Sequence, residues 1–172
     1  MNSGKKHTLN LIKEGFACIE VGVWKGEFST QILTKNPNRL YLVDPWAFIP
    51  KYTDRWYGGD LAKSQEDMDK IFKEIVDKFE NDQRVEILRG YSKEEIKKIN
   101  NLDWSYIDGN HSYEFVLEDI KLLYEKIKKG GFVCGDDMQK PGVYNAVTDF
   151  SKEIFLEPTI IENHFVFTKM ED

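Results

Sequence analysis

The sequence predicts an α/β protein built on a doubly wound, mostly parallel sheet. Short apolar runs typical of strands alternate along the chain with segments whose apolar residues recur at helical spacing. The first five runs are too continuously apolar to leave one face in water, so helices should cover both faces of the sheet. The last two runs are separated by only one or two residues, which favours an antiparallel hairpin at the end of the chain.

The first half of the chain contains two predicted strands and two predicted helices. A strand over residues 16–21 ends in a glycine-bearing turn, and residues 27–35 then follow helical spacing. The second strand covers residues 39–44 and leads into an unusual aromatic segment over residues 45–60. Residues 65–79 form a helix with one apolar face, preceded by a serine that can cap its first turn.

The middle of the chain continues the alternation. Residues 84–89 alternate with period two and predict the third strand, and residues 92–95 open a short helix with a capping box. The fourth strand covers residues 102–108. A long helix over residues 113–127 is expected to close at the glycine pair 130–131, because a left-handed residue is favourable at a helix carboxyl end.

The last part of the chain completes the sheet. A fifth strand is expected over residues 132–135, followed by a helix marked by apolar residues between 143 and 154. Two short strands, over residues 158–162 and 164–169, form the final hairpin.

Length and charge limit the class of protein. A chain of 172 residues without repeat or linker is expected to form one domain, 1–172, with its core over about 16–169. The net charge of −6 provides no basic field for nucleic acid. No apolar stretch is long enough to span a membrane and residues 1–10 are polar, so no membrane partner and a cytoplasmic location are expected. Cys18 and Cys134 lie in apolar runs and should pack in the core.

Ligands of parallel sheets bind outside the carboxyl ends of the strands, so residues there are candidate binding residues. Gly22 allows a tight turn after the first strand, and the acid Glu20 beside it suits a cationic or neutral ligand better than a pyrophosphate. Asp44 lies 24 residues after Glu20, near the offset of an acid that binds ribose hydroxyls, but it is equally well explained as a turn residue. Tyr91 and Ser92 could frame an adenine or simply begin a helix.

Three carboxylates follow the fourth and fifth strands. Asp108, Asp136 and Asp137 would repel one another unless a positive group lies between them. A divalent cation with oxygen ligands, such as Mg²⁺ or Mn²⁺, would supply that charge. The alternative is that Asp137 caps the next helix and Asp136 faces solvent.

His111 is the histidine best placed for proton transfer. It lies three residues after Asp108 in the same loop, whereas His7 lies in a terminus expected to be mobile and His164 lies in the final hairpin. An ordinary surface or capping histidine is the other interpretation.

Four motifs in this order resemble those of the class I S-adenosylmethionine-dependent methyltransferases. They are the glycine turn over 20–29, Asp44, the Asp-Gly-x-His segment over 108–113 and the Gly-Asp-Asp segment over 135–137. Within that class the chain is most similar to the subfamily of macrocin O-methyltransferase and other metal-dependent sugar O-methyltransferases, over about residues 16–169. The resemblance implies a Rossmann-like sheet of seven strands in the order 3-2-1-4-5-7-6, with strand seven antiparallel.

The resemblance also implies roles for individual residues. It implies that S-adenosylmethionine is held by Glu20, Gly22, Trp24, Gly26, Ser29, Asp44, Tyr91, Ser92 and Asp108. It implies that Asp108, Asp136 and Asp137 ligate Mg²⁺ or Mn²⁺, and that His111 or Asp108 takes a proton from the acceptor. A metal ligand makes a poor base, which favours His111.

The expected function is therefore metal-assisted O-methylation of a hydroxyl on a small molecule or sugar. The alternatives are a catalytically silent S-adenosylmethionine-binding module or a Rossmann-like nucleotide-binding module. A homo-oligomer is possible. The acceptor is expected to meet the aromatic segment, which also suits a lid or a dimer contact. The candidate residues in this segment are Trp46, Phe48, Lys51, Tyr52, Arg55, Trp56 and Tyr57.

Overall fold

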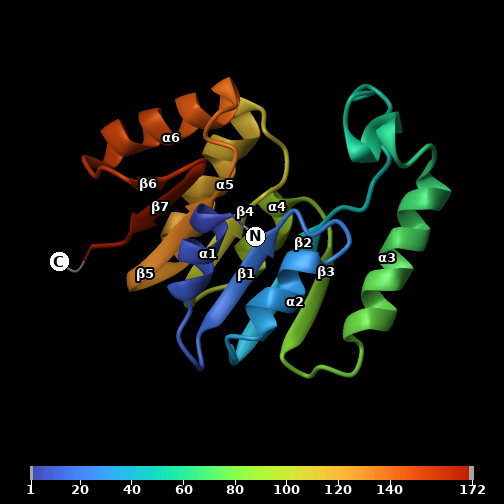
Figure 1. The fold of residues 1–172 in the computed structure, drawn as a ribbon, viewed down its shortest axis with the longest axis horizontal. Coiled ribbons are helices and arrows are strands. Elements are labelled where there is room, and N and C mark those ends of the chain that lie inside the picture. Colours follow the sequence, from blue (N-terminus) through green and yellow to red (C-terminus); the bar gives the residue numbers. More distant parts are fainter. Residues whose placement is uncertain (1, 171–172) are drawn as a thin grey trace.

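A computed structural model describes residues 2–170 and confirms the predicted fold class (Figure 1). The seven strands form one sheet in the order β3-β2-β1-β4-β5-β7-β6. The first five strands along the chain pair in parallel, and β7 runs antiparallel to both β5 and β6. The strands are β1 Ala17–Val21, β2 Arg39–Asp44, β3 Val85–Arg89, β4 Leu102–Ile107, β5 Ile127–Gly135, β6 Thr159–Ile161 and β7 His164–Thr168.

Helices flank the sheet on both faces (Figure 1). They are α1 Ser3–Asn10, α2 Glu27–Leu33, α3 Gln65–Phe79, α4 Ser92–Glu95, α5 Tyr113–Lys126 and α6 Pro141–Ile154, with a π-helical turn η1 Trp56–Asp60 and a 3-10 turn η2 Ile96–Lys98. Within residues 2–170, none of them has the length and apolar character needed to cross a bilayer.

Alternation along the strands divides the core into two layers. Cys18 of β1 lies in the layer with residues of α1, α2 and α3, whereas its neighbour Ile19 lies in the layer with residues of η2, α5 and α6. Cys18 and Cys134 are buried free thiols, as expected for residues that act as small hydrophobes. Ser64 caps α3 as predicted, because its side chain accepts a hydrogen bond from the backbone N–H of Asp67.

The amino-terminal segment corrects one expectation. Residues 3–10, treated as a polar and mobile terminus, form helix α1, which packs beside β6 and β7. Asn2 caps the helix, and the indole N–H of the buried Trp104 donates to the backbone carbonyl of Thr8. Only Gly4, Thr8 and Leu9 of this helix are buried, so it shows no apolar periodicity in the sequence.

The glycine pair 130–131 is a second correction. Helix α5 ends at Lys126 and the chain enters β5 directly at Ile127, so these glycines lie within the strand instead of closing the helix. Gly130 has a φ of +77°, and the pairing of β4 with β5 shifts register in this region. The irregularity explains why a glycine is required there.

The capping box predicted for residues 92–95 is also wrong. Tyr91 occupies the N-cap position of α4, and Ser92 is already inside the helix. The Ser92 hydroxyl bonds to the buried Asp119 of α5, and Glu95 pairs with Lys98 instead of the helix start. Helix α4 is thus held by contacts with α5 rather than by its own first turn.

Candidate active site

The loop after β1 requires glycine at its first turn. Gly22 has a φ of +87°, and a Cβ placed there would lie 2.3 Å from the backbone carbonyl oxygen of Asp108. The loops that follow β1 and β4 therefore touch through a position that has no room for a side chain. Gly26, at φ +68°, lies against Ile75 and Phe79 of α3, so the second glycine allows α2 and α3 to pack closely.

Glu20 is a buried acid at the carboxyl end of β1. The Ser29 hydroxyl of α2 donates a hydrogen bond to Glu20 Oε2. Burial raises the pKa of Glu20 to about 8, and the neighbouring carboxylates of Asp108 and Asp44 act in the same direction, whereas Ser29 and Lys5 oppose them. The carboxyl end of β1 thus holds a buried acid whose neutral form is favoured by its surroundings.

Asp44, at the end of β2, organises the turn. Its Oδ2 accepts backbone N–H bonds from Val23 and Trp24, both at 3.0 Å, and its Oδ1 accepts one from Trp46 at 2.7 Å. Burial raises the pKa of Asp44, and these hydrogen bonds oppose that rise. The structure therefore shows the turn role directly, while the ribose role stays a prediction.

Three further cofactor candidates, Trp24, Tyr91 and Ser92, differ in their contacts. Tyr91 is exposed, and the Ser92 hydroxyl is engaged by Asp119. Trp24 has a left-handed φ of +52°, and its ring lies 5.6 Å from that of Trp56. The predicted cofactor roles of Trp24, Tyr91 and Ser92 stay predictions.

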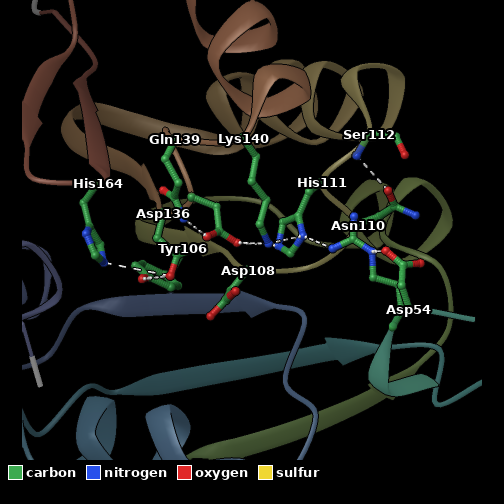
Figure 2. Close-up of polar contacts among 12 residues, drawn as sticks. Asp54, Tyr106, Asp108, Asn110, His111, Ser112, Asp136, Gln139, Lys140 and His164 are labelled. Carbon is green, nitrogen blue, oxygen red and sulfur yellow. Dashed lines mark hydrogen bonds and ion pairs between the residues drawn. The ribbon is translucent and has the colours of Figure 1, made fainter. Parts of the chain in front are cut away.

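The loops after β4 and β5 bring together Asp108, His111 and Asp137, as Figure 2 shows for His111 and its neighbours. One ligand atom from each of the three residues lies within 4.8 Å of the others. Asp137 Oδ2 lies 2.8 Å from His111 Nε2 and 2.7 Å from the ammonium of Lys140. Although burial alone would raise the pKa of Asp137, these two contacts hold it well below its ordinary value. Asp137 therefore stays ionised.

The Asp136 side chain contacts Tyr106 and His164 and not His111. The Tyr106 hydroxyl donates to Asp136 Oδ2 at 3.2 Å, and His164 Nε2 lies 3.9 Å from the same oxygen (Figure 2). Burial raises the pKa of Asp136 to about 8, and the charges of Asp108 and Asp137 add to the rise. Asp136 Oδ1 is buried and has no hydrogen-bond partner among the described residues.

Neither alternative for the consecutive acids fits the structure. Helix α6 has Lys140 at its N-cap position and no side-chain cap, so Asp137 does not cap it. Asp136 keeps only 18% of its side-chain surface exposed and does not face solvent. Asp137 has a left-handed φ of +62°, a conformation that costs energy in a non-glycine residue and is common at functional sites.

Positive charge does lie among these carboxylates, and it comes from two lysines that the sequence did not reveal. Lys5 of α1 places its ammonium 3.3 Å from Asp108 Oδ2 and over the ring of Phe28, 4.4 Å from the centroid. Lys140 pairs with Asp137. No motif marks Lys5, whereas the i+3 spacing of Lys140 from Asp137 was a usable signal.

The aromatic segment reaches the site through Arg55. Arg55 Nη1 lies 2.6 Å from His111 Nδ1, and Lys140 Nζ lies 2.8 Å from the same nitrogen. Trp56 is 55% exposed, so its ring is available to a ligand. Trp46 is fully buried in the core, which corrects the expectation that it contacts an acceptor. Its indole N–H donates to the Trp24 carbonyl, so it supports the loop from beneath.

This fold, with a buried acid at the carboxyl end of β1 and a glycine turn after it, defines a class I S-adenosylmethionine-dependent methyltransferase domain. Residues 19–138, well over half of the chain, match the family described as Methyltransferase domain. The chain belongs to that family, and the predicted methyltransferase class is confirmed.

Solved structures with the same fold include several methyltransferases. The O-methyltransferase NovP superposes with a TM-score of 0.69 at 22% identity, covering 97% of this chain and 78% of NovP. SMU.1697c, a putative methyltransferase from Streptococcus mutans in complex with SAH, gives 0.67 at 12% identity, covering 96% of each chain. An rRNA methylase from Streptococcus thermophilus gives 0.61 at 11% identity, covering 97% of this chain and 94% of that one. These identities show the fold alone.

A curated relative matches a shorter region. Uncharacterized protein R132 of Acanthamoeba polyphaga mimivirus is 37% identical over 59 residues, which is 32% of this chain and 27% of the viral protein. The match therefore spans about a quarter of that relative's length.

Proposed function

We propose that this chain transfers a methyl group from S-adenosylmethionine to a hydroxyl of a small molecule, with His111 as the general base and a divalent cation at the acidic cluster. The observation that carries the proposal is the grouping of Asp108, His111 and Asp137 at the carboxyl ends of two adjacent strands. Parallel sheets bind their ligands at this edge.

The residues of the β1 loop fit a cationic cofactor. Glu20 and Ser29 would face its methionine part, and Asp44 would hold ribose hydroxyls. Glu20 is buried and its pKa is raised, and on losing its proton it would supply a negative charge to a sulfonium or ammonium ligand. The same fold in SMU.1697c was solved in complex with SAH. When bound, S-adenosylmethionine supplies an electrophilic methyl group, and a divalent cation would lower the cost of deprotonating the acceptor hydroxyl.

The acidic cluster fits a hard divalent cation. Asp108 and Asp137 offer carboxylate oxygens, which Mg²⁺ and Mn²⁺ prefer. His111 lies beside them and is kept for the base, because a metal ligand makes a poor base. The buried Oδ1 of Asp136 has no partner among the described residues, and it would gain one if that side chain joined the site. Lys5 and Lys140 now neutralise Asp108 and Asp137, so a cation would have to compete with them.

His111 has the arrangement of a general base. Arg55 can only donate, so His111 Nδ1 presents a lone pair to it and the proton of a neutral ring lies on Nε2, which is 2.8 Å from Asp137 Oδ2. Asp137 would stabilise the imidazolium that forms when Nδ1 takes the hydroxyl proton. Asp108, paired with Lys5, is the second candidate base.

The nature of the acceptor and the alternative of a silent binding module complete the proposal. A sugar acceptor is favoured by the resemblance to sugar O-methyltransferases, and the net charge of −6 disfavours an RNA acceptor of the kind named for the Streptococcus thermophilus structure. A silent binding module is the less favoured alternative, because such a module has no use for a histidine held between an acid and two cations.

The first test needs no knowledge of the acceptor. S-adenosylhomocysteine is titrated calorimetrically into the protein with Mg²⁺ and then with EDTA. We expect micromolar binding and a separate Mg²⁺ heat that Asp137→Asn abolishes. Absence of S-adenosylhomocysteine binding would contradict the cofactor class, and a Mg²⁺ heat unchanged in Asp137→Asn would contradict the metal site.

The second test concerns the base. In an assay of S-adenosylhomocysteine release with a panel of hydroxyl acceptors, His111→Ala should lose about a hundredfold or more in rate. His7→Ala, on α1, is the matched control and should keep the wild-type rate. Equal rates for His111→Ala and wild type would refute the role of His111.

A further inference from the structure

His111 Nδ1 is approached by more donors than it can accept from. An imidazole nitrogen has a single lone pair, yet the guanidinium of Arg55 lies 2.6 Å from it and the ammonium of Lys140 lies 2.8 Å from it. Lys140 has a second partner in Asp137 Oδ2 at 2.7 Å. Arg55 is therefore the cation with donor capacity to spare.

The surroundings of Arg55 leave that capacity open. Its Nε lies 3.8 Å from Asp54, whose side chain is 81% exposed, so this ion pair is long and weakly held. A guanidinium has five N–H donors in a planar fork. The Arg55 side chain is 30% exposed at the edge of the cluster, next to the exposed ring of Trp56. The Arg55 fork is therefore partly exposed directly beside His111, where a ligand can bind it.

The contact of Arg55 with His111 occupies the lone pair that a general base needs. While Arg55 or Lys140 donates to Nδ1, that nitrogen cannot take a proton from an acceptor hydroxyl. A neutral hydroxyl offers Arg55 no more than the imidazole does. A carboxylate or phosphate offers two parallel charge-assisted hydrogen bonds, which are about twice as strong as neutral ones.

We propose that the acceptor is an anion, and that its carboxylate or phosphate group binds Arg55 and Lys140 and thereby frees His111 Nδ1. This inference rests on the proposed function and names the substrate class for that site. The exposed ring of Trp56 lies beside Arg55 in the sequence and 5.6 Å from the ring of Trp24, so it offers a face to the remainder of the acceptor.

The proton and methyl transfers balance without another reactant. His111 Nδ1 takes the proton of the acceptor hydroxyl while the acceptor oxygen forms a bond to the methyl carbon and the carbon–sulfur bond breaks. The products are the methyl ether and S-adenosylhomocysteine. The proton then leaves His111 to solvent, and Arg55 returns to Nδ1 when the anionic product departs.

The test compares anions with neutral ligands of the same shape. Inorganic phosphate is the smallest probe, and two matched pairs distinguish the source of the charge: 3,4-dihydroxybenzoate against 3,4-dihydroxybenzamide, and glucose 6-phosphate against glucose. Each is titrated into protein saturated with S-adenosylhomocysteine and Mg²⁺, and the ¹⁵N resonances of His111 are followed. We expect the anion of at least one pair to bind about tenfold or more tightly than its neutral partner. Its binding should shift the Nδ1 resonance toward that of a free lone pair.

Variants assign the effect to the residue. Arg55→Leu should lose the preference for the anion, and Arg55→Lys should keep part of it. Arg39→Leu, at a half-exposed arginine paired with Glu86, is the matched control and should behave as wild type. Lys140→Met gives a second measurement and should weaken anion binding less than Arg55→Leu, because Lys140 is shared with Asp137.

The outcomes distinguish failure of the anionic-acceptor inference from failure of the proposed methyltransferase function. No anion preference in either pair, together with no response of His111 to phosphate, overturns the inference, as does an anion preference retained in Arg55→Leu. If S-adenosylhomocysteine itself fails to bind wild-type protein, the proposed function fails instead. Binding of S-adenosylhomocysteine by Arg55→Leu at wild-type affinity shows that the variant is folded.

Discussion

Glu20 predicts a strong pH dependence of cofactor binding. Its pKa is about 8 in the ligand-free protein because the carboxyl is buried, so most molecules hold it protonated at pH 6. A sulfonium or ammonium group bound beside it requires the ionised form. Binding must therefore release the proton, and affinity should rise with pH until Glu20 is already ionised.

The size of the effect follows from that pKa. About one molecule in a hundred has Glu20 ionised at pH 6 and about half at pH 8, when its pKa is about 8. The affinity for S-adenosylmethionine should therefore increase about fiftyfold between pH 6 and pH 8, or about 2.3 kcal/mol.

Calorimetry in two buffers with different heats of ionisation measures both the affinity and the protons released. We expect close to one proton released per cofactor at pH 6, and Glu20→Gln should abolish both the release and the slope. Asp119→Asn removes another buried acid, on α5, and should leave the slope intact. An affinity that stays flat from pH 6 to pH 8 would refute the reasoning. A slope that persists in Glu20→Gln would refute it equally, because Asp136 would then be the titrating group.

Three further predictions concern stability and metal binding. The pKa of Asp119 is raised by burial from 3.8 to about 7, so the folded state keeps a proton that the unfolded chain has lost. Its contribution to the free energy of unfolding should therefore fall by about 2–3 kcal/mol from pH 5 to pH 8. Urea unfolding should show this fall in the wild-type protein and not in Asp119→Asn. Gly22→Ala should weaken S-adenosylhomocysteine binding, and it should destabilise the fold by more than the ~1 kcal/mol expected for Gly15→Ala. Both glycines have positive φ, but of the two only Gly22 has backbone within 4 Å of the added Cβ. Equal losses for the two would show that crowding at Gly22 is unimportant. Lys5→Met should tighten Mg²⁺ binding about two- to fivefold, because it removes a cation that competes for Asp108. Lys6→Met, at an exposed lysine of the same helix, is the control and should leave Mg²⁺ binding unchanged. Weaker Mg²⁺ binding in Lys5→Met would mean that Lys5 does not compete.

Most of the fold could be predicted because its signals are local. Among the parallel strands, β3 alternates with period two and the others contain short apolar runs, and α3 has a serine cap and a full apolar face. Helix α1 could not be predicted, since its buried face consists of Gly4, Thr8 and Leu9 and is recognised only by the strands it covers. The glycines at 130–131 were misplaced because a glycine pair after a helix looks the same whether it ends the helix or allows a strand to change register.

The candidate site could be predicted for its acids but not for its cations. Asp108, Asp136 and Asp137 lie directly after strands, so the topology of a parallel sheet brings them to one edge. Lys5 reaches Asp108 from a segment 103 residues away, and Arg55 reaches His111 across 56 residues. Such contacts depend on how a terminal helix and a long loop fold back over the sheet, and no spacing in the sequence encodes them.

The origin of the charges around the acidic cluster bears on how related domains can diverge. The acids and His111 lie within residues 19–138, the part of the chain that defines the family. Lys5, Lys140 and His164 come from outside that part. Changes in α1, at the start of α6 or in β7 could therefore adjust the charge balance at the acids, and with it metal affinity and working pH, while every motif of the family stays unchanged. A search for variation in pH optimum among relatives should begin with these flanking elements.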